Sequence, residues 1–353
     1  MSTQMSSRKL ALGIMTFSLL ALLVGIFNAA RLGQEVAKQQ KSEGHGSGVS
    51  SFLNKRDHLA LIELSGMITM DAGNDNGLFH SESNAMQARK SLDEAAKDDS
   101  IKGVLLRINS PGGTVGMSQE LNAAVQRVSK KKPVVVSMGD LTASGGYYTA
   151  CAADKILANP GTLTASIGVI ISTLDFTDLM QQKLGVHPLT VKSGKFKDVL
   201  SPYRHATPEE VALIQRLINE SYQDFLGAVI KGRTRFMTNE VEKQARIAKI
   251  KAVADGRVVT GNQGVEAGLV DEIGDQERAY TVLDLMAKER ANLKGKERLP
   301  LESEENRFSL TDFLGLPSES MVPAIPGAAS AVQAAKMLPL SMRYPNQPLW
   351  VLE

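Results

Sequence analysis

Residues Val134–Tyr148, VVVSMGDLTASGGYY, place an apolar run directly before a glycine-rich turn. The run Val134–Met138 predicts a buried strand, and the small residues of Tyr147–Ala153 predict the helix that follows it. Ser144 lies between them, flanked by Ala143 and two glycines, so little bulk blocks access to its hydroxyl. Backbone N–H groups at the start of a helix point toward any anion nearby. The stretch therefore predicts a strand–turn–helix unit that exposes one serine.

The same alternation of strand, turn and helix continues on both sides of this stretch. The run Gly103–Asn109 is almost continuously apolar, as expected for a strand whose two faces are both covered. The predicted strands are residues 58–64, 103–109, 134–138, 155–158 and 167–171. The predicted helices are residues 83–96, 118–132, 147–153, 176–184, 207–231, 239–249 and 276–291. This order favours a layered α/β domain with right-handed crossovers, whose ligands lie at the ends of the strands.

The N-terminus predicts a membrane anchor. Residues 10–30 carry no charge and are long enough to span a bilayer, and two basic residues precede them. We expect residues 1–9 to be a short cytoplasmic N-terminus and the globular part to lie on the extracytoplasmic side, although the flanking positive charges are nearly balanced. Residues 31–55 predict a flexible tether, 56–293 the catalytic domain, and 294–353 a proline-rich tail with one short helix near 328–337.

Composition excludes several other classes of protein. The net charge is only +2 over 353 residues, so no strongly basic surface indicates a nucleic-acid partner. Cys151 is the single cysteine, and no Cys/His cluster of metal-binding type occurs. No phosphate-binding loop, dinucleotide fingerprint or HExxH motif appears. We therefore expect no metal and no cofactor.

Three sets of residues could carry chemistry beside Ser144. The turn predicted at Ser110–Thr114 contains a Gly-Gly pair whose backbone amides could stabilise an oxyanion, or which could simply form a tight turn. Ser110 is a rival nucleophile without an evident base. Three lysines, Lys192, Lys195 and Lys197, could each act as a base if the amine is held neutral by burial, and sequence alone does not choose among them. None of the five histidines stands in a pattern typical of a Ser-His-Asp triad.

Six ordered blocks over about two hundred residues carry a resemblance to a known family. They are residues 109–113 (NSPGG), 143–148 (ASGGYY), 153–156 (ADKI), 164–169 (TASIGV), 192–198 (KSGKFKD) and 254–258 (ADGRV). The chain resembles the signal peptide peptidase A family, membrane-anchored bacterial serine peptidases with a Ser–Lys dyad, in its short, single-repeat form. The resemblance implies a Clp protease/crotonase-like fold, assembly into a homo-oligomeric ring, and peptide substrates such as remnant signal peptides.

The resemblance also implies a role for each site residue. Ser144 would be the nucleophile, Lys197 the general base, and Ser166 the residue that orients the lysine. Backbone N–H groups of Gly113 and Gly145 would form the oxyanion hole. Since a carboxylate near the amine would favour its charged form, we expect Asp198 to point away from Lys197.

Two alternatives remain at this point. A crotonase-superfamily enzyme of the same fold would bind acyl-CoA and use an oxyanion hole without a nucleophilic serine. An inactive relative would act as a membrane scaffold. The anchor and the tail lie outside the six blocks, so the resemblance assigns them no role.

Overall fold

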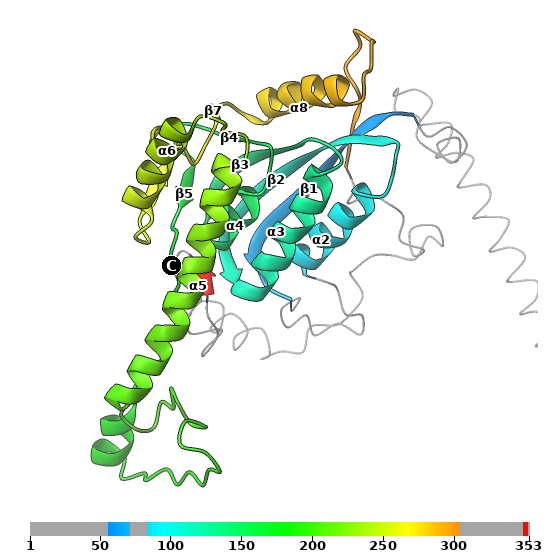
Figure 1. Ribbon diagram of the computed structural model, residues 1–353. Helices are drawn as coiled ribbons and strands as arrows, with labels where there is room; N and C mark the ends of the chain where they lie inside the picture. Colours follow the sequence, from blue (N-terminus) through cyan, green and yellow to red (C-terminus); the bar gives the residue numbers. More distant parts are fainter. Residues whose placement is uncertain (1–55, 71–82, 304–348, 352–353) are drawn as a thin grey trace, which may run out of the picture. The chain divides into compact units, whose positions relative to one another are not determined.

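The computed structural model describes residues 56–70, 83–303 and 349–351 (Figure 1). The predicted anchor at 10–30, the tether and the helix near 328–337 lie outside these residues. Within the described ranges, no helix is both long enough and apolar enough to cross a bilayer.

A mainly parallel sheet forms the centre of the domain, in the order β6-β5-β3-β2-β1-β8. The strands are β1 His58–Ile68, β2 Ile101–Thr114, β3 Val134–Ala143, β4 Lys155–Ala158, β5 Leu163–Ala165, β6 Val258–Thr260, β7 Glu272–Ile273, β8 Leu301–Ser303 and β9 Leu349–Val351. Strand β3 pairs with β4 along its first half and with β5 along its second. Only β5–β6 and β2–β9 are antiparallel among the described pairs. The predicted layered α/β fold with a parallel sheet is confirmed.

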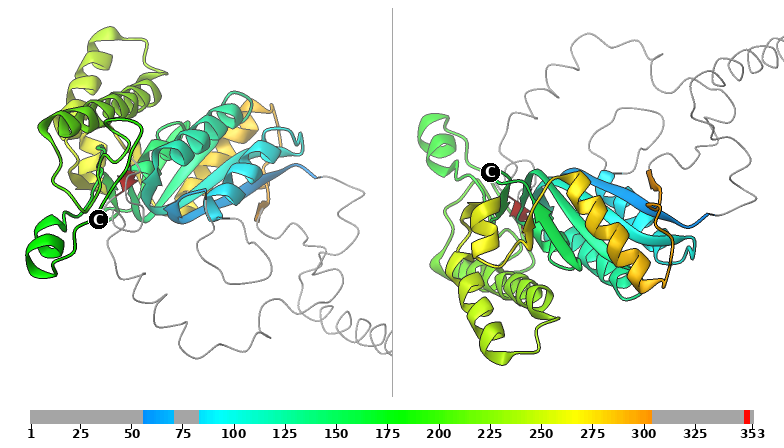
Figure 2. Two further views of the ribbon diagram at one scale, coloured as in Figure 1. Left: turned by 90° about the horizontal axis from the view of Figure 1, so that it is seen from below. Right: turned by 90° about the horizontal axis from the view of Figure 1, so that it is seen from above.

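Helices cover both faces of this sheet. They are α2 Asn84–Ala95, α3 Val115–Ser129, α4 Gly145–Ala150, α5 Pro208–Thr234, α6 Glu240–Val253, α7 Gly261–Glu266 and α8 Gln276–Arg290. Figure 2 shows α8 on the opposite face from α2 and α3. In β2, Val104 and Leu106 pack into the larger core with α2, α3 and α4, whereas Leu105 packs against Leu283 of α8. Burial on both faces explains why the β2 sequence is almost continuously apolar.

Two local predictions were wrong, and a third was correct in its position but not in its type of helix. Residues 110–114 are not a turn, because β2 continues through them to Thr114. Residues 167–171 are not a strand, and the strand of this region is β5 at 163–165. The helix predicted at 176–184 is present over residues 177–183. Its last five residues, Leu179–Lys183, form a π-helical turn without a buried residue.

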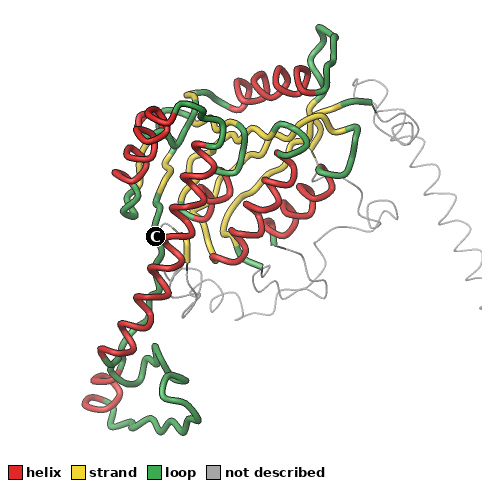
Figure 3. Tube along the Cα trace, viewed as in Figure 1, coloured by secondary structure: helices red, strands yellow, loops and turns green. Residues whose placement is uncertain are grey.

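A long segment between β5 and α5, residues 166–206, extends away from the sheet alongside the N-terminal half of α5 (Figures 1 and 3). We call this segment the arm. It is mostly loop, and it carries exposed apolar side chains that include Leu189 and Val191, 89% and 91% exposed. The C-terminal half of α5 packs on the core instead, where Phe225 meets Tyr148 of α4 edge-to-face with ring centroids 5.2 Å apart. Helix α5 thus links the arm to the sheet domain.

Candidate active site

Ser144 lies at the junction of β3 and α4 in a backbone conformation that few residues other than glycine adopt. Its φ is 51° and its ψ is −117°, and it is the N-cap residue of α4. Such strain persists only where the surrounding structure imposes it, and it is concentrated at functional sites. The Ser144 side chain does not cap the helix. The strand–turn–helix prediction is therefore confirmed, with a sharper turn than the sequence suggested.

The Ser144 residue is buried, only 1% exposed, so the prediction of an exposed hydroxyl was wrong for this single chain. Its Oγ has no hydrogen-bond partner among the described residues. A buried hydroxyl without a partner forfeits about 1–3 kcal/mol of solvation, so the structure keeps this group ready for a partner at a cost in stability.

Ser166 is held next to Ser144 by the pairing of two parallel strands. Ala143, the last residue of β3, is the register partner of Ala165, the last residue of β5. The N–H of Ser144 donates to the carbonyl of Ala165 at 2.8 Å. Ser166 also has a positive φ, 50°, and is 6% exposed. Two serines that lie 22 positions apart in sequence are thus neighbours at the same end of the sheet.

The Gly112–Gly113 segment forms the last part of β2 beside α4. A Cβ on Gly113 would lie 2.0 Å from the carbonyl oxygen of Ile68, and Gly112 has a φ of 104°. A side chain at position 113 would displace β1, and at position 112 it would be strained by the positive φ. Ser110, the rival nucleophile, is fully buried and its Oγ accepts a hydrogen bond from the Gly112 N–H at 3.1 Å. Ser110 therefore stabilises the strand that carries Gly113.

The edge of β2 changes its partner strand beside this segment. Strand β3 pairs with β2 only as far as Ser110 and Thr142. Beyond that pair, β9 from the chain's own C-terminus occupies the edge of β2, antiparallel to residues 112–114, with Gly113 opposite Trp350. This edge of β2 can therefore pair with an extended segment.

Lys197 is located in the arm, and its side chain is exposed. Its backbone N–H donates to Gly194 at 3.1 Å, but its amine makes no hydrogen bond or ion pair within the described ranges. The other two candidate lysines are engaged: Lys192 pairs with Asp198, and Lys195 with Glu209. Asp198 binds Lys192 and Arg204, and no ion pair joins it to Lys197. The expectation that Asp198 points away from Lys197 is met.

Cys151, the C-cap residue of α4, is unsuited to chemistry. It is fully buried, and its Sγ donates to the Tyr148 carbonyl at 3.1 Å. Burial raises the pKa of the thiol to about 12, which leaves almost no thiolate at neutral pH. Within the described residues, no group of three or more His, Cys, Asp or Glu side chains could hold a metal ion.

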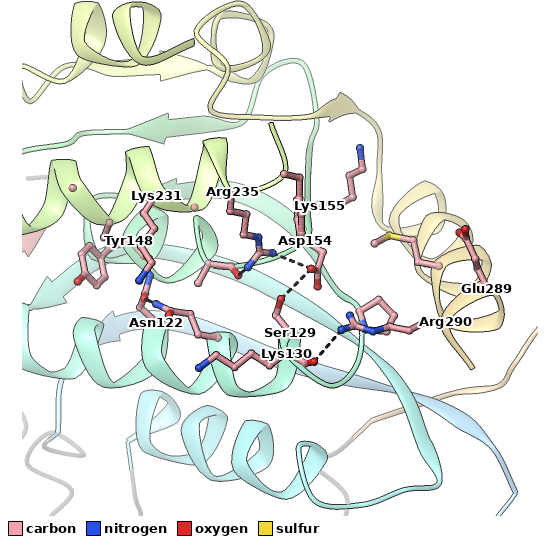
Figure 4. Close-up of a pocket in the computed structure, with 18 residues that line it drawn as sticks. Asn122, Ser129, Lys130, Tyr148, Asp154, Lys155, Lys231, Arg235, Glu289 and Arg290 are labelled. Carbon is pink, nitrogen blue, oxygen red and sulfur yellow. Dashed lines mark hydrogen bonds and ion pairs between the residues drawn. The ribbon is translucent and has the colours of Figure 1, made fainter. Parts of the chain in front are cut away.

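A separate hollow of about 1020 Å³ lies between α3, α5 and α8 (Figure 4). Arg235 and Ser129 meet there at the carboxylate of Asp154, at 2.9 and 3.0 Å. Its lining includes neither Ser144, Ser166 nor Lys197. The hollow is therefore distinct from the serine site.

A known protein family matches the part of the chain that carries these residues. The family model described as Peptidase family S49 matches residues 126–290, a range that includes Ser144, Ser166 and Lys197. A putative protease of Methanocaldococcus jannaschii is 37% identical over 272 residues, covering 76% of this chain and 83% of the relative. A putative signal peptide peptidase of Enterococcus faecium is 36% identical over 269 residues, covering 76% and 71%.

Among solved structures, a variant of the membrane-bound stomatin-specific protease 1510-N aligns with a TM-score of 0.41 at 12% identity, covering 70% of this chain and 97% of that one. The sequence relatives are similar over most of both chains, and they carry protease names. None of these comparisons supports the acyl-CoA or scaffold alternatives. The chain belongs to Peptidase family S49 and is a serine peptidase.

Proposed function

We propose that this peptidase cleaves extended, apolar peptides, remnant signal peptides among them, through a dyad of Ser144 and Lys197. The observation that carries the proposal is the state of Ser144: a strained residue whose buried Oγ lacks a partner, next to Ser166. A structural serine in such a place would bond to the nearest carbonyl. A nucleophilic serine instead needs a hydroxyl that is free to donate its proton to a base, as the Ser144 hydroxyl is.

In the proposed reaction, the Ser144 Oγ attacks the peptide carbonyl while the neutral Lys197 amine takes its proton. The N–H groups of Gly113 and Gly145 receive the developing oxyanion, each donor contributing about 3 kcal/mol in comparable sites. The lysine then returns the proton to the leaving amine, and an acyl-enzyme forms. Water repeats the sequence and releases the second product. Ser166 orients the lysine amine.

The choice of Lys197 follows from the partners of the three lysines. An ammonium held by a carboxylate is stabilised in its charged form, which is the wrong form for a base. Lys192 and Lys195 are both held in this way, whereas the Lys197 amine has no partner within the part of the chain that the structure describes. Of the three, Lys197 is the amine that can enter a site elsewhere.

We propose that this site is completed by a second copy of the chain in a ring. Lys197 is exposed on an arm that extends away from the sheet, while Ser144 is buried at a strand end. The arm also exposes apolar side chains such as Leu189 and Val191. Large exposed apolar surfaces on soluble domains are typical of contacts with other chains. Packing of the arm on a neighbour would bury both the apolar surface and the lysine.

The substrate class is inferred from the edge of β2 that β9 occupies, where a substrate peptide would take the place of β9. A peptide that adds a strand there uses backbone hydrogen bonds, which are independent of sequence, and needs an extended conformation. The relative in Enterococcus faecium is named a putative signal peptide peptidase. Apolar segments released in a membrane are such substrates. The uncharged residues 10–30 would anchor the enzyme beside them, with the catalytic domain on the extracytoplasmic side. The catalytic domain would have a Clp protease/crotonase-like fold.

A fluorophosphonate probe tests the nucleophile directly. The probe is expected to label the wild type and Ser110→Ala, and to leave Ser144→Ala unlabelled. Mass spectrometry of the labelled peptide identifies the modified residue. Labelling of Ser110 in a folded Ser144→Ala protein, or no labelling of an active wild type, would refute the assignment.

A further inference from the structure

The residue after Lys197 is Asp198, and hydrogen bonds from Arg204 hold its side chain and its backbone in place. Arg204 donates from Nε to Oδ2 of Asp198 and from Nη2 to Oδ1, both at 2.8 Å. Nη2 also donates to the backbone carbonyl of Asp198 at 3.1 Å. Arg204 therefore holds both the side chain and the main chain of the residue next to Lys197.

The same guanidinium reaches the start of α5. Its Nη1 donates to Oε2 of Glu210 at 2.9 Å, and its Nη2 bonds to the second carboxylate oxygen. The Glu210 side chain is only 4% exposed. It also accepts from the N–H of Thr207 at 2.9 Å and completes the capping box of the helix. Glu210 is thus fixed to a helix of 27 residues, and Arg204 is fixed to Glu210.

The negative charge of Asp198 is balanced by Lys192 and Arg204, without Lys197. Hydrogen bonds from Arg204, and then from Lys192, hold the pKa of the Asp198 carboxyl well below its usual range. Asp198 is therefore an anion at any working pH, and its effect on Lys197 depends only on which cations it faces. Other ion pairs of the arm do not involve Asp198: Lys195 pairs with Glu209, and His205 with Asp175 and Asp178.

We propose that Arg204 is a positioning residue for the lysine base: it fixes the Lys197 turn to the start of α5 and takes up the charge of Asp198. This inference rests on the proposed role of Lys197. Without Arg204, the only ion pair left between the turn and the helix among the described residues is the exposed Lys195–Glu209 pair, which contributes little. Asp198 keeps only Lys192 as a partner, so its second carboxylate oxygen becomes available to the adjacent amine. A free carboxylate near the amine would stabilise its protonated form and so remove the base.

The test measures kcat/KM against pH for Arg204→Gln, Arg204→Lys and the double variant Arg204→Gln/Asp198→Asn. In Arg204→Gln we expect kcat/KM to fall about 10-fold or more and the rising limb of the profile to move by about one unit to higher pH. In the double variant the carboxylate is gone, so the rising limb of the pH profile should return to its wild-type position. Its kcat should stay low, because the turn still lacks the Arg204 link to α5. Arg204→Lys keeps a cation but cannot bridge both carboxylates, so it lowers kcat with the limb unmoved.

Lys195→Gln is the matched control, because it removes an exposed cation and an ion pair from the same arm. It is expected to match the wild type in both rate and profile. An Arg204→Gln profile equal to that of this control would overturn the inference, as would a double variant whose limb stays displaced. If Arg204→Gln fails to assemble, an Arg204→Lys protein with wild-type kcat would overturn it equally.

Lys197→Ala, measured in the same series, separates this inference from the proposed function. Full activity of Lys197→Ala would refute the dyad itself. An inactive Lys197→Ala beside an unaltered Arg204→Gln would refute only the role of Arg204. Circular dichroism and gel filtration establish that each variant is folded and assembled.

Discussion

The N–H of Ser144 donates to the carbonyl of Ala165, so the predicted nucleophile and Ser166 are joined through one backbone hydrogen bond. Both serines follow the paired last residues of parallel strands, and both have a φ near +50°. Their separation is thereby set by the sheet and not by side-chain packing. The two serines therefore form a rigid part of the site, whereas Lys197 lies on a different segment, the arm.

Ser166→Ala is expected to lower kcat about 10–100-fold, the range for loss of one hydrogen bond to a charged or reacting group. The backbone should not change, because alanine tolerates the conformation about as well as serine. Steady-state kinetics give kcat, and fluorophosphonate labelling of Ser144 should persist at a lower rate. Wild-type kcat in this variant would exclude a role in orienting the lysine.

Lys197→Ala is expected to lower peptide hydrolysis about 10³-fold or more, since general-base catalysis contributes up to about 10⁴-fold. Lys195→Ala should retain activity, because its amine is engaged with Glu209. If neighbouring copies share the site, mixing inactive Ser144→Ala with inactive Lys197→Ala before assembly should restore part of the activity. No recovery in a mixture that demonstrably contains both chains would place the dyad within one copy.

Gly113→Ala is expected to reduce stability by about 1–3 kcal/mol, the cost of forcing an extra group into a packed interior. Its Cβ would lie 2.0 Å from the Ile68 carbonyl oxygen, so β1 must move. Gly161→Ala is the control, since nothing lies within 4 Å of its added Cβ. Thermal denaturation compares the two variants, and equal melting temperatures would contradict the close approach.

Glu210→Gln should show a stability loss that depends on pH. Hydrogen bonds from Arg204, and then from Thr207, lower the pKa of the Glu210 carboxyl to about 2, against about 4.3 in an unfolded chain. The carboxylate therefore stabilises the fold above pH 4.3, and this contribution disappears as pH falls toward 2. The gap in melting temperature between wild type and variant should narrow from pH 6 to pH 3. A constant gap would contradict the pairing.

Cys151 should resist thiol reagents in the native protein. Its raised pKa, about 12, and its complete burial leave neither a thiolate nor a path to it. Iodoacetamide at pH 8 is expected to leave both the thiol and peptidase activity unchanged, and to alkylate Cys151 after unfolding in guanidinium chloride. Rapid inactivation of the native enzyme would point to a cysteine mechanism instead.

The sheet and its central helices could be predicted from sequence because the residues that favour each strand or helix locally are also the apolar residues that the core buries. The apolar run of β2 is an example, because its side chains are buried on both faces of the sheet as the sequence predicts. The helix predicted at 83–96 is another, and it is found as α2. The extension of β2 through Gly112 could not be predicted, because Pro111 and two glycines normally indicate a turn. It is extended here because β1 and β9 pair with it on either side.

In the candidate site, too, some features could be predicted from the sequence and others could not. Ser144 follows a motif that is local in sequence, so its strand–turn–helix setting could be predicted. Its burial could not, because that depends on how β3 and β5 end together. The choice among the three lysines also required coordinates, since it depends on Asp198 and Glu209 as partners. Arg204 was missed because a single arginine in a loop carries no pattern.

One carboxylate, that of Glu210, both completes the capping box of α5 and receives Arg204. The number of residues between Arg204 and Thr207 therefore cannot change without breaking one bond or the other. The exposed residues around Leu189 have no such constraint within the described chain. In an engineered version, insertions or fused tags should be tolerated near Leu189 as far as the fold of one copy is concerned, whereas a single residue added after Arg204 should uncouple the lysine turn from its helix.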